Sequence, residues 1–323
     1  MTSWGVTLAW LLRKTGHEVT LIARTPEEAS AAAVLRGVAR LPEITLDPAV
    51  SFAHPAEMPS NLDGFVAVVP AQAIRSTFAH AGFDRSVPIL CAAKGIELSS
   101  GGLLSSVFEE LGWDAAKIAA ISGPNLAHEI AQGMPAAAVI AARDEALAMR
   151  WQDALSSPSF RVYRTGDITG VELAGALKNV VAIAVGAGFG LGFGANLAAA
   201  IVTRGLAEMT RLGIPLGAQP LTFQGLAGVG DLTATCFSPL SRNRRLGELL
   251  ARGSTLAEAH AAIGEVVEGA ATAPVAAKLA ARLAVSAPII DCVAGALDGR
   301  LTVQEAMALL LSRQPKPEEF ARF

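Results

Sequence analysis

The chain has 323 residues, of which 52% are hydrophobic and 17% charged, and its formal net charge is −3. This composition excludes a disordered protein, and the length suffices for two domains with substantial cores. The slightly acidic balance gives no electrostatic reason to expect nucleic-acid binding, so a phosphate site must be a local cluster of basic groups. The cysteines lie far apart with no CxxC pair, which indicates neither a disulfide framework nor a metal site and favours the reducing cytoplasm: Cys91, Cys236 and Cys292.

Short apolar strands alternate with helices in the first half of the chain, and this predicts an α/β doubly wound (Rossmann-like) domain with a parallel sheet. The predicted strands are His17–Ala23, Phe65–Val69, Val87–Ala92, Ile118–Ile121, Ala136–Ala141 and Phe160–Tyr163. The predicted helices are Thr7–Leu12, Pro26–Arg36, Ala71–Ala79 and one near Leu103–Leu111. From about Thr165 the strand signals fade and alanine- and leucine-rich helices dominate. We therefore expect a dinucleotide-binding domain over residues 1–164 and an all-α domain over residues 165–323.

The chain begins MTSWG, where a doubly wound domain usually carries a first strand and a G-x-G-x-x-G turn for the dinucleotide pyrophosphate. Gly5 can serve as the third glycine, but Thr2 stands at the second position. We expect either a start placed too far downstream or a truncated product with poor cofactor affinity. The first residues lack the basic start and cleavage site of a signal peptide.

The predicted strand His17–Ala23 corresponds to the second strand of a doubly wound domain, and Arg24 and Thr25 follow it where an acidic residue would bind the ribose of NAD. Arg24 instead favours the 2′-phosphate of NADP. A solvated surface arginine is the alternative.

A lysine interrupts the apolar stretch Gly170–Val181, which reads GVELAGALKNVV and predicts a buried helix. Lysine is rarely buried without a partner, and burial lowers its pKa toward the range useful for proton transfer. Lys178 is therefore a candidate general acid or base. The alternatives are a lysine whose ammonium reaches solvent and a structural ion pair with Glu172.

The uncharged stretch Asn179–Thr203 is long enough to span a bilayer. Alternating glycines from Gly186 to Gly194 should break a continuous helix, so we expect two buried helices joined by a glycine-rich bend.

Eight segments, taken in order, resemble the bacterial NAD(P)-dependent glycerol-3-phosphate dehydrogenases over nearly the whole chain. They are SWG at Ser3–Gly5, AAKGIE at Ala92–Glu97, SGPN at Ser122–Asn125, GVELAGALKNV at Gly170–Val180, TRGLAEMTRLG at Thr203–Gly213, GLAGVGDL at Gly225–Leu232, SRNRRLG at Ser241–Gly247 and EVVEGAATA at Glu265–Ala273.

The resemblance implies reversible reduction of dihydroxyacetone phosphate to sn-glycerol 3-phosphate, which feeds glycerophospholipid synthesis. A positioned lysine can stabilise the developing oxyanion and supply its proton, and the resemblance assigns this role to Lys178. It also implies that Lys94, at the end of a predicted strand, contacts substrate and cofactor. An ordinary surface lysine is the alternative.

The remaining substrate contacts implied by the resemblance come from three segments. Asp231 is expected to bind a substrate hydroxyl or to orient a lysine, with a helix N-cap as the alternative. The basic cluster after Leu240 suits a phosphate, with a solvated helix start as the alternative. The full substrate set is Lys94, Gly123, Asn125, Lys178, Asp231, Ser241, Arg242 and Asn243.

The cofactor, NADP in preference to NAD, is expected to contact Ser3, Trp4, Gly5, Arg24, Lys94, Ala127, Arg242, Val266 and Glu268. Without the resemblance, Glu268 would be interpreted as a surface acid.

Four residues depart from the family pattern. Asn125 replaces the usual serine or threonine, and Arg40 stands where a tyrosine is common. Phe189 and Ala195 occupy positions that are commonly aspartate, so Lys178 is expected to have fewer charged partners.

We expect the active site in the cleft between the domains, with Lys94 on one side and Lys178, Asp231 and Arg242 on the other. The alternatives are a related hydroxy-acid dehydrogenase, which would not need the Arg242 and Asn243 cluster, and a degenerate non-catalytic nucleotide-binding protein. We expect a small phosphorylated substrate, no nucleic acid, no membrane span and no catalytic histidine. The oligomeric state, including a homodimer, stays open.

Overall fold

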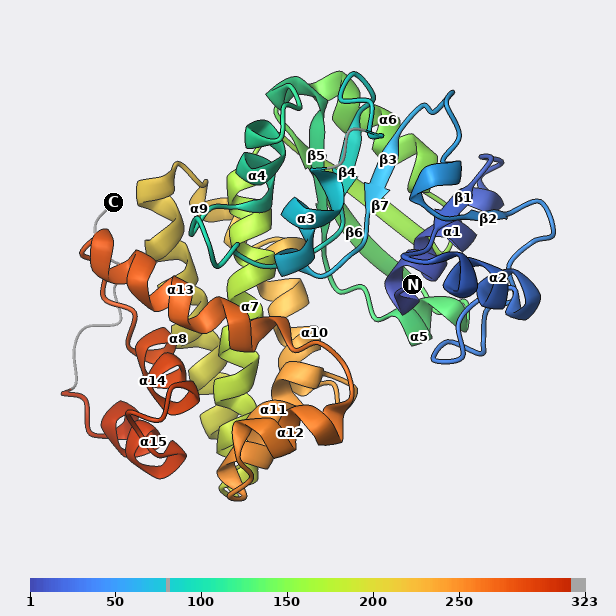
Figure 1. Cartoon of the computed structure of the whole chain (residues 1–323). Coiled ribbons are helices and arrows are strands. Elements are labelled where there is room, and N and C mark those ends of the chain that lie inside the picture. Colours follow the sequence, from blue (N-terminus) through green and yellow to red (C-terminus); the bar gives the residue numbers. More distant parts are fainter. Residues whose placement is uncertain (80–81, 315–323) are drawn as a thin grey trace. The chain divides into compact units, whose positions relative to one another are not determined.

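The computed structural model describes residues 1–79 and 82–314, and the contacts between residues divide the chain into two units (Figure 1). The first unit comprises Met1–Ala93 and Leu104–Ile168. The second comprises Lys94–Leu103 and the chain from Thr169 onward. The domain boundary expected after Arg164 stays a prediction.

Seven strands and six α-helices make up the described part of the first unit. The strands are β1 (Thr20–Ile22), β2 (Ser51–Ala53), β3 (Phe65–Ala67), β4 (Ile89–Cys91), β5 (Ile118–Ser122), β6 (Ala136–Ala142) and β7 (Phe160–Thr165). The helices are α1 (Ser3–Lys14), α2 (Pro26–Leu35), α3 (Ile74–Phe78), α4 (Leu104–Glu110), α5 (Ala127–Ala131) and α6 (Glu145–Leu155). The predicted helix at Ala71–Ala79 begins as a 3₁₀ turn over Ala71–Ala73 before α3.

The sheet differs from the single parallel sheet that we expected. β1 pairs with β2 in one small parallel sheet, and β3, β4, β5, β6 and β7 form a second sheet in that order. Within the larger sheet β5 and β6 are antiparallel, while its other pairs are parallel. A parallel return needs a long crossover, and only the short helix α5 separates β5 from β6, so the chain reverses direction instead.

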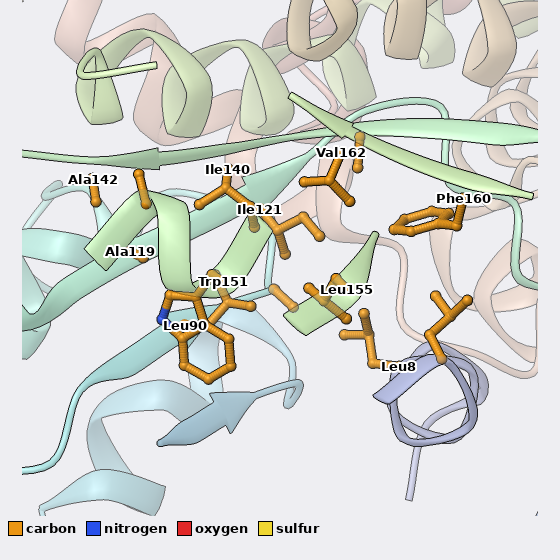
Figure 2. Packing of buried hydrophobic residues seen from close by; sticks show 14 of the residues in the cluster. Leu8, Leu90, Ala119, Ile121, Ile140, Ala142, Trp151, Leu155, Phe160 and Val162 are labelled. Carbon is orange, nitrogen blue, oxygen red and sulfur yellow. The ribbon is translucent and has the colours of Figure 1, made fainter. Parts of the chain in front are cut away.

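The larger sheet owes its stability to apolar side chains packed between its strands and the helices α1 and α6 (Figure 2). Leu8 of α1 and Trp151 of α6 contribute to this cluster with strand residues such as Leu90, Ile121 and Phe160. Burial of such side chains is the main force that holds the layers together.

The second unit is helical in its described part. Its helices are α7 (Ile168–Gly190), α8 (Ala195–Gly213), α9 (Pro220–Phe223), α10 (Asp231–Phe237), α11 (Arg242–Ala251), α12 (Leu256–Ile263), α13 (Glu268–Arg282), α14 (Pro288–Leu297) and α15 (Val303–Leu311). A π-helical turn, η5 (Leu226–Gly230), leads directly into α10. Two of these helices, α12 and α15, begin with capping boxes at Thr255 and Thr302, which explains where they start.

The helix α7 corrects one expectation. It runs unbroken through Gly186 and Gly188 and ends at Gly190, so the bend before α8 occupies only the residues after it. The glycines serve packing: a Cβ at Gly186 would overlap the carbonyl oxygen of Arg244, and one at Gly247 would overlap that of Ile183. Because these two residues lack side chains, the backbones of α7 and α11 can come into direct contact.

Among the described residues α7 is the one helix long and apolar enough to cross a membrane. However, 94% of its most apolar window is buried inside the protein, and the core helix of a globular unit meets the same criteria.

We predict that Gly186→Ala lowers the free energy of unfolding by about 3 kcal/mol, because the new methyl group must push the α11 backbone away. The matched control is Gly188→Ala in the same helix, whose Cβ would lie 3.6 Å from Leu197 Cδ2, an ordinary contact. The control should be neutral or gain about 0.5 to 1 kcal/mol from helix propensity. Urea denaturation measures both, and equal effects would contradict the close packing of α7 on α11.

Candidate active site

Lys178 lies in α7 with its side chain buried, and its ammonium has two partners on α10. Its Nζ donates to Asp231 Oδ1 at 2.7 Å and to Thr235 Oγ1 at 2.7 Å. The residue is only 7% exposed. The lysine that stood out in the apolar stretch is thus buried with a carboxylate and a hydroxyl rather than extended to solvent.

Asp231 receives three donors on one buried carboxylate. Besides Lys178, Lys94 Nζ donates to Oδ2 at 2.6 Å and Thr235 Oγ1 donates to Oδ1 at 3.3 Å. Asp231 is the first residue of α10, whose N-cap is Gly230. The carboxylate instead joins the two lysines, and we call Lys94, Lys178, Asp231 and Thr235 the lysine–aspartate cluster.

The turn η5 positions Asp231. A Cβ at Gly228 would overlap the carbonyl oxygen of Phe223, so this glycine lets the π-helical turn fold against α9. Insertions of this kind into a helix often occur at functional sites, because they redirect the side chains that follow.

The cluster shifts two pKa values in ways that suit proton transfer. Burial, together with the nearby Lys94 ammonium, lowers the pKa of Lys178 to about 8, although Asp231 opposes this shift. For Asp231, burial alone would raise the pKa, but the ammonium groups of Lys178 and Lys94 outweigh burial and hold it below its usual range. The aspartate is therefore ionised at neutral pH, beside a lysine that can release its proton.

Lys94 follows β4, and its contacts place it in the second unit together with Asp231. Its side chain keeps 18% of its surface exposed, compared with 9% for Lys178. The expected site between the two domains stays a prediction, whereas the meeting of Lys94, Lys178 and Asp231 is a feature of one unit.

The basic cluster lies at the start of α11. Ser241 is the N-cap, and its Oγ accepts from Arg244 N at 3.3 Å. Arg242 points to the surface, where its Nη1 lies 3.4 Å from Glu265 Oε2. An exposed ion pair of this length is weak, so the guanidinium can exchange partners at little cost.

Asn243 links three helices instead of pointing outward. Its Nδ2 donates to Asn179 Oδ1 at 2.8 Å, and its Oδ1 accepts from Gly269 N at 2.9 Å. This places α11 against the residue next to Lys178 and against the start of α13. Among the described residues, Asn179 takes one of the two Nδ2 hydrogens of Asn243.

The residues near the start of the chain that we expect to bind the cofactor lie on the first turn of α1. Thr2 caps this helix by accepting from Gly5 N at 3.0 Å, and its hydroxyl donates to Val68 O at 3.1 Å. A Cβ at Gly5 would lie 3.1 Å from Thr2 Oγ1, a tight contact, and 3.6 Å from Val68 Cβ, an ordinary one. The first amides of α1, at Ser3 and Trp4, thus point out of a helix N-terminus, a position that attracts anions.

The side chain of Arg24 is 87% exposed. It has an acidic neighbour that we did not predict from its position after the strand. Glu28 Oε2 accepts from the main-chain N of Arg24 at 3.1 Å and lies 3.4 Å from its Nε. Glu28 also pairs with the amino group of Met1.

The SGPN turn has the backbone shape that its glycine suggested. Gly123 has a φ of +135°, where a side chain would be strained, and a Cβ there would also lie 2.9 Å from the carbonyl oxygen of Ala137. The Oδ1 and Nδ2 atoms of Asn125 are buried and have no hydrogen-bond partner among the described residues. Ala127 follows as the first residue of α5.

The other expected residues lie at the surface or on packed helices. Val266 is 50% exposed, and Glu268 is the first residue of α13. Phe189, in place of an acid, lies under the guanidinium of Arg244 at 4.6 Å. Arg40 Nη2 donates to the carbonyl oxygen of Met1 at 3.1 Å, and Ala195 is the first residue of α8.

Two residues of this region were not singled out from the sequence. Thr235 lies four residues after Asp231 and therefore on the same helix face, a spacing that could have indicated it. Asn179 follows Lys178 directly, and its contact with Asn243 requires the tertiary structure.

Comparison with known proteins covers both halves of the chain. The family model for the N-terminus of NAD-dependent glycerol-3-phosphate dehydrogenase matches residues 1–148, and the model for its C-terminus matches residues 167–308. The glycerol-3-phosphate dehydrogenase [NAD(P)+] of Brucella canis is 44% identical over 98% of this chain and 97% of its own. The protein of the same name from Mesorhizobium japonicum is 42% identical over 98% of this chain and 91% of its own. The crystal structure of glycerol-3-phosphate dehydrogenase from Coxiella burnetii superimposes with a TM-score of 0.91, with 34% identity and 97% of each chain covered.

We predict that Asp231→Asn lowers the free energy of unfolding by about 3 kcal/mol at pH 7, because two ammonium groups then share a site without a counter-charge. The loss should shrink as the pH rises and Lys178 loses its proton. Urea denaturation at pH 7 and pH 9 measures this. Glu265→Gln is the control, since it removes the exposed partner of Arg242 and should cost less than about 1 kcal/mol. If both substitutions cost the same at pH 7, the cluster does not depend on the charge of Asp231.

Proposed function

The chain belongs to the NAD-dependent glycerol-3-phosphate dehydrogenase family, and we propose that it reduces dihydroxyacetone phosphate to sn-glycerol 3-phosphate, reversibly, with Lys178 as the general acid. The observation that carries the mechanism is the buried ammonium of Lys178, held by Asp231 and Thr235 and shifted in pKa to about 8.

Lys178 has the donor geometry that the reaction requires. An ammonium group has three N–H donors, and among the described residues Asp231 and Thr235 take two of them. The third can point at the carbonyl oxygen of the substrate, stabilise the negative charge that develops there and then transfer its proton. In the reverse direction the neutral amine accepts the proton of the alcohol.

The charges of the cluster favour an anionic substrate. Two ammonium groups and one carboxylate leave a net positive charge in a mostly buried setting, where electrostatic attraction is stronger than in water. Asp231 keeps both lysines in place, and Lys94, the more exposed of the two, is proposed to contact the substrate and the cofactor. Thr235 accepts from Lys178 while donating to Asp231, which fixes the direction of the ammonium.

The phosphate is proposed to bind at the start of α11. The guanidinium of Arg242 can donate two parallel hydrogen bonds to a phosphate. Breaking its exposed ion pair with Glu265 costs little free energy. Ser241 retains a hydroxyl hydrogen and Asn243 one amide hydrogen for the same ligand. Gly123 and Asn125 stay predicted substrate contacts.

The enzyme uses NAD or NADP, and the bound nicotinamide supplies the hydride. We propose that the amides of the first turn of α1 bind the pyrophosphate, because a helix N-terminus attracts anions. We propose that Arg24 binds the 2′-phosphate, giving a preference for NADP. Its neighbour Glu28 must then turn away. The other proposed cofactor contacts are Lys94, Ala127, Arg242, Val266 and Glu268.

The cellular setting is also a proposal. The three cysteines are buried and form no disulfide among the described residues, which is compatible with the reducing cytoplasm. There the product would enter glycerophospholipid synthesis. A homodimer stays a prediction, for sedimentation to test. The match to both halves of one family favours this function over the hydroxy-acid dehydrogenase and the degenerate protein.

We predict that Lys178→Ala lowers kcat for reduction of dihydroxyacetone phosphate by about a thousandfold, because the oxyanion loses its proton donor. In the unmodified enzyme, kcat/KM for reduction should be flat below pH 8 and fall about tenfold per unit above it, since only the ammonium donates. Alcohol oxidation needs the neutral amine and should rise through the same range. Absorbance of NAD(P)H follows both directions.

The control for Lys178→Ala is Lys278→Ala, which removes an exposed lysine of α13 and should leave kcat unchanged. Near-full turnover of a folded Lys178→Ala protein would rule out the mechanism. The same conclusion follows if the fall above pH 8 persists in that variant's residual activity.

We predict that Arg242→Ala raises KM for dihydroxyacetone phosphate about a hundredfold, because a phosphate loses its bidentate, charge-assisted partner. Unphosphorylated dihydroxyacetone should be affected much less. Arg245→Ala, another exposed arginine of α11, serves as the control. Equal losses for both substrates would place the phosphate elsewhere and favour a substrate without one.

We predict that Arg24→Ala raises KM for NADPH about tenfold and leaves KM for NADH unchanged, because only NADPH carries the 2′-phosphate. Arg143→Ala, which removes an exposed arginine paired with Glu109, is the control. An equal effect on both cofactors would refute the proposed NADP preference of this position.

A further inference from the structure

Three arginines in the first turn of α11 differ in how far their side chains reach into solvent. Arg242 keeps 42% of its side chain exposed, and Arg245 is exposed as well. Arg244 keeps only 19% exposed, because its guanidinium contacts neighbouring helices. The phosphate contacts proposed above do not include Arg244, so this arginine has a different task in the same turn.

The guanidinium of Arg244 contacts three helices of the second unit. Its Nη1 donates to the carbonyl oxygen of Phe237, the last residue of α10, at 2.7 Å. Its Nε donates to Glu248 Oε1, one turn later in α11, at 2.7 Å. Its Cζ lies 4.6 Å from the centre of the Phe189 ring, near the end of α7. One side chain thus connects α7, α10 and the first turn of α11.

These contacts are electrostatically favourable. The carbonyl of Phe237 lies in the last turn of α10, where carbonyl groups lack helical donors and the helix dipole attracts a cation. A guanidinium over an aromatic ring is attracted by the negative face of the ring, and more strongly where water is partly excluded. The rings of Phe189 and Phe237 also pack edge to face, with centres 6.5 Å apart. The two phenylalanines therefore hold the guanidinium of Arg244 in one place.

The main chain of Arg244 is fixed as well. Its N–H donates to Oγ of Ser241, the N-cap of α11, at 3.3 Å. Its carbonyl oxygen lies where a Cβ at Gly186 would be, only 2.0 Å from that position, so the backbones of α11 and α7 touch here. Side chain and main chain together fix the turn of α11 that carries the proposed phosphate contacts.

Helix α10 relates this turn to the proton donor. It begins at Asp231, which binds the ammonium of Lys178, and it ends at Phe237. Arg244 connects that end directly to the first turn of α11, across residues 238–241. The distance from the ammonium to the phosphate contacts therefore depends on how firmly Arg244 holds the end of α10.

We propose that Arg244 is a positioning residue for the phosphate end of the substrate. With Phe189 and Phe237 as its partners, it holds the first turn of α11 so that Arg242 and Asn243 meet the phosphate at a fixed distance from Lys178. Arg244 does not itself bind the phosphate in this arrangement. This inference rests on the proposed function.

The first test is Arg244→Ala. It should raise KM for dihydroxyacetone phosphate about tenfold with kcat little changed, because the phosphate contacts lose their fixed position and binding is weakened. For unphosphorylated dihydroxyacetone, kcat/KM should stay within about twofold, since this substrate does not use those contacts. General damage to the fold would lower activity toward both substrates, so the ratio between them separates positioning from structural loss.

Two further variants separate position from charge. Arg244→Lys keeps the positive charge but loses the planar group that lies over Phe189 and reaches two acceptors, so it should keep most of the tenfold rise in KM. Arg245→Ala is the matched control, because it removes the same charge from an exposed side chain one residue later. It should change KM by less than about twofold.

The contact with Phe189 is tested by a double-mutant cycle. Phe189→Leu removes the aromatic face but keeps an apolar side chain, and it should raise KM for dihydroxyacetone phosphate about threefold. In the Arg244→Ala background the same change should cause no further rise, because the guanidinium is already absent. If Arg244→Ala does not fold, as judged by circular dichroism, the cycle is made with Arg244→Lys.

Three outcomes would overturn the inference: equal losses for the two substrates, full recovery of KM in Arg244→Lys, or additive effects of the two changes in the cycle. Failure of the proposed function has a different signature. If the unmodified chain does not oxidise NAD(P)H with dihydroxyacetone phosphate, the reaction is wrong and the inference is wrong with it. If Arg242→Ala raises KM and Arg244→Ala does not, the reaction stands and only the role of Arg244 is refuted.

Discussion

A single buried carboxylate organises the catalytic side of this protein. Asp231 has two oxygens and holds the ammonium groups of Lys178 at 2.7 Å and of Lys94 at 2.6 Å. Buried charges of one sign repel strongly, so without the carboxylate the two ammonium groups would destabilise each other. The ammonium groups keep Asp231 ionised, whereas burial and the neighbouring Lys94 lower the pKa of Lys178 against the opposing effect of Asp231.

Close packing of the α7 and α11 backbones connects the helix that carries Lys178 to the start of α11, where we expect the phosphate. Gly186 and Gly247 let α7 and α11 touch, and Gly269 lies against the carbonyl oxygen of Asn179 and the amide of Asn243. The hydrogen bond that Asn243 donates to Asn179 and the one that it accepts from Gly269 N follow from that proximity. The start of α11 is therefore tied to the helix that carries the proposed acid, so a phosphate bound there would be held at a defined distance from Lys178.

The first unit obeys a different constraint, because its helix α1 packs on two sheets at once. The apolar faces of α1 stabilise both, although β1 and β3 do not pair with each other in the described structure. Burial of apolar side chains under α1 thus holds both described sheets to one helix.

The sequence by itself determined the alternation of strands and helices, the change to helices in the second half and the unusual lysine at position 178. These features depend on local pattern: apolar periodicity, turn residues and a charge within an apolar run. The tertiary structure alone decided that Asp231 joins Lys94 to Lys178, that Thr235 and Asn179 take part, that α7 continues through its glycines and that β6 reverses direction. Each of these depends on which distant segments meet. The cost of burying a charge and the space beside a glycine are set by those neighbours, and local pattern does not contain them.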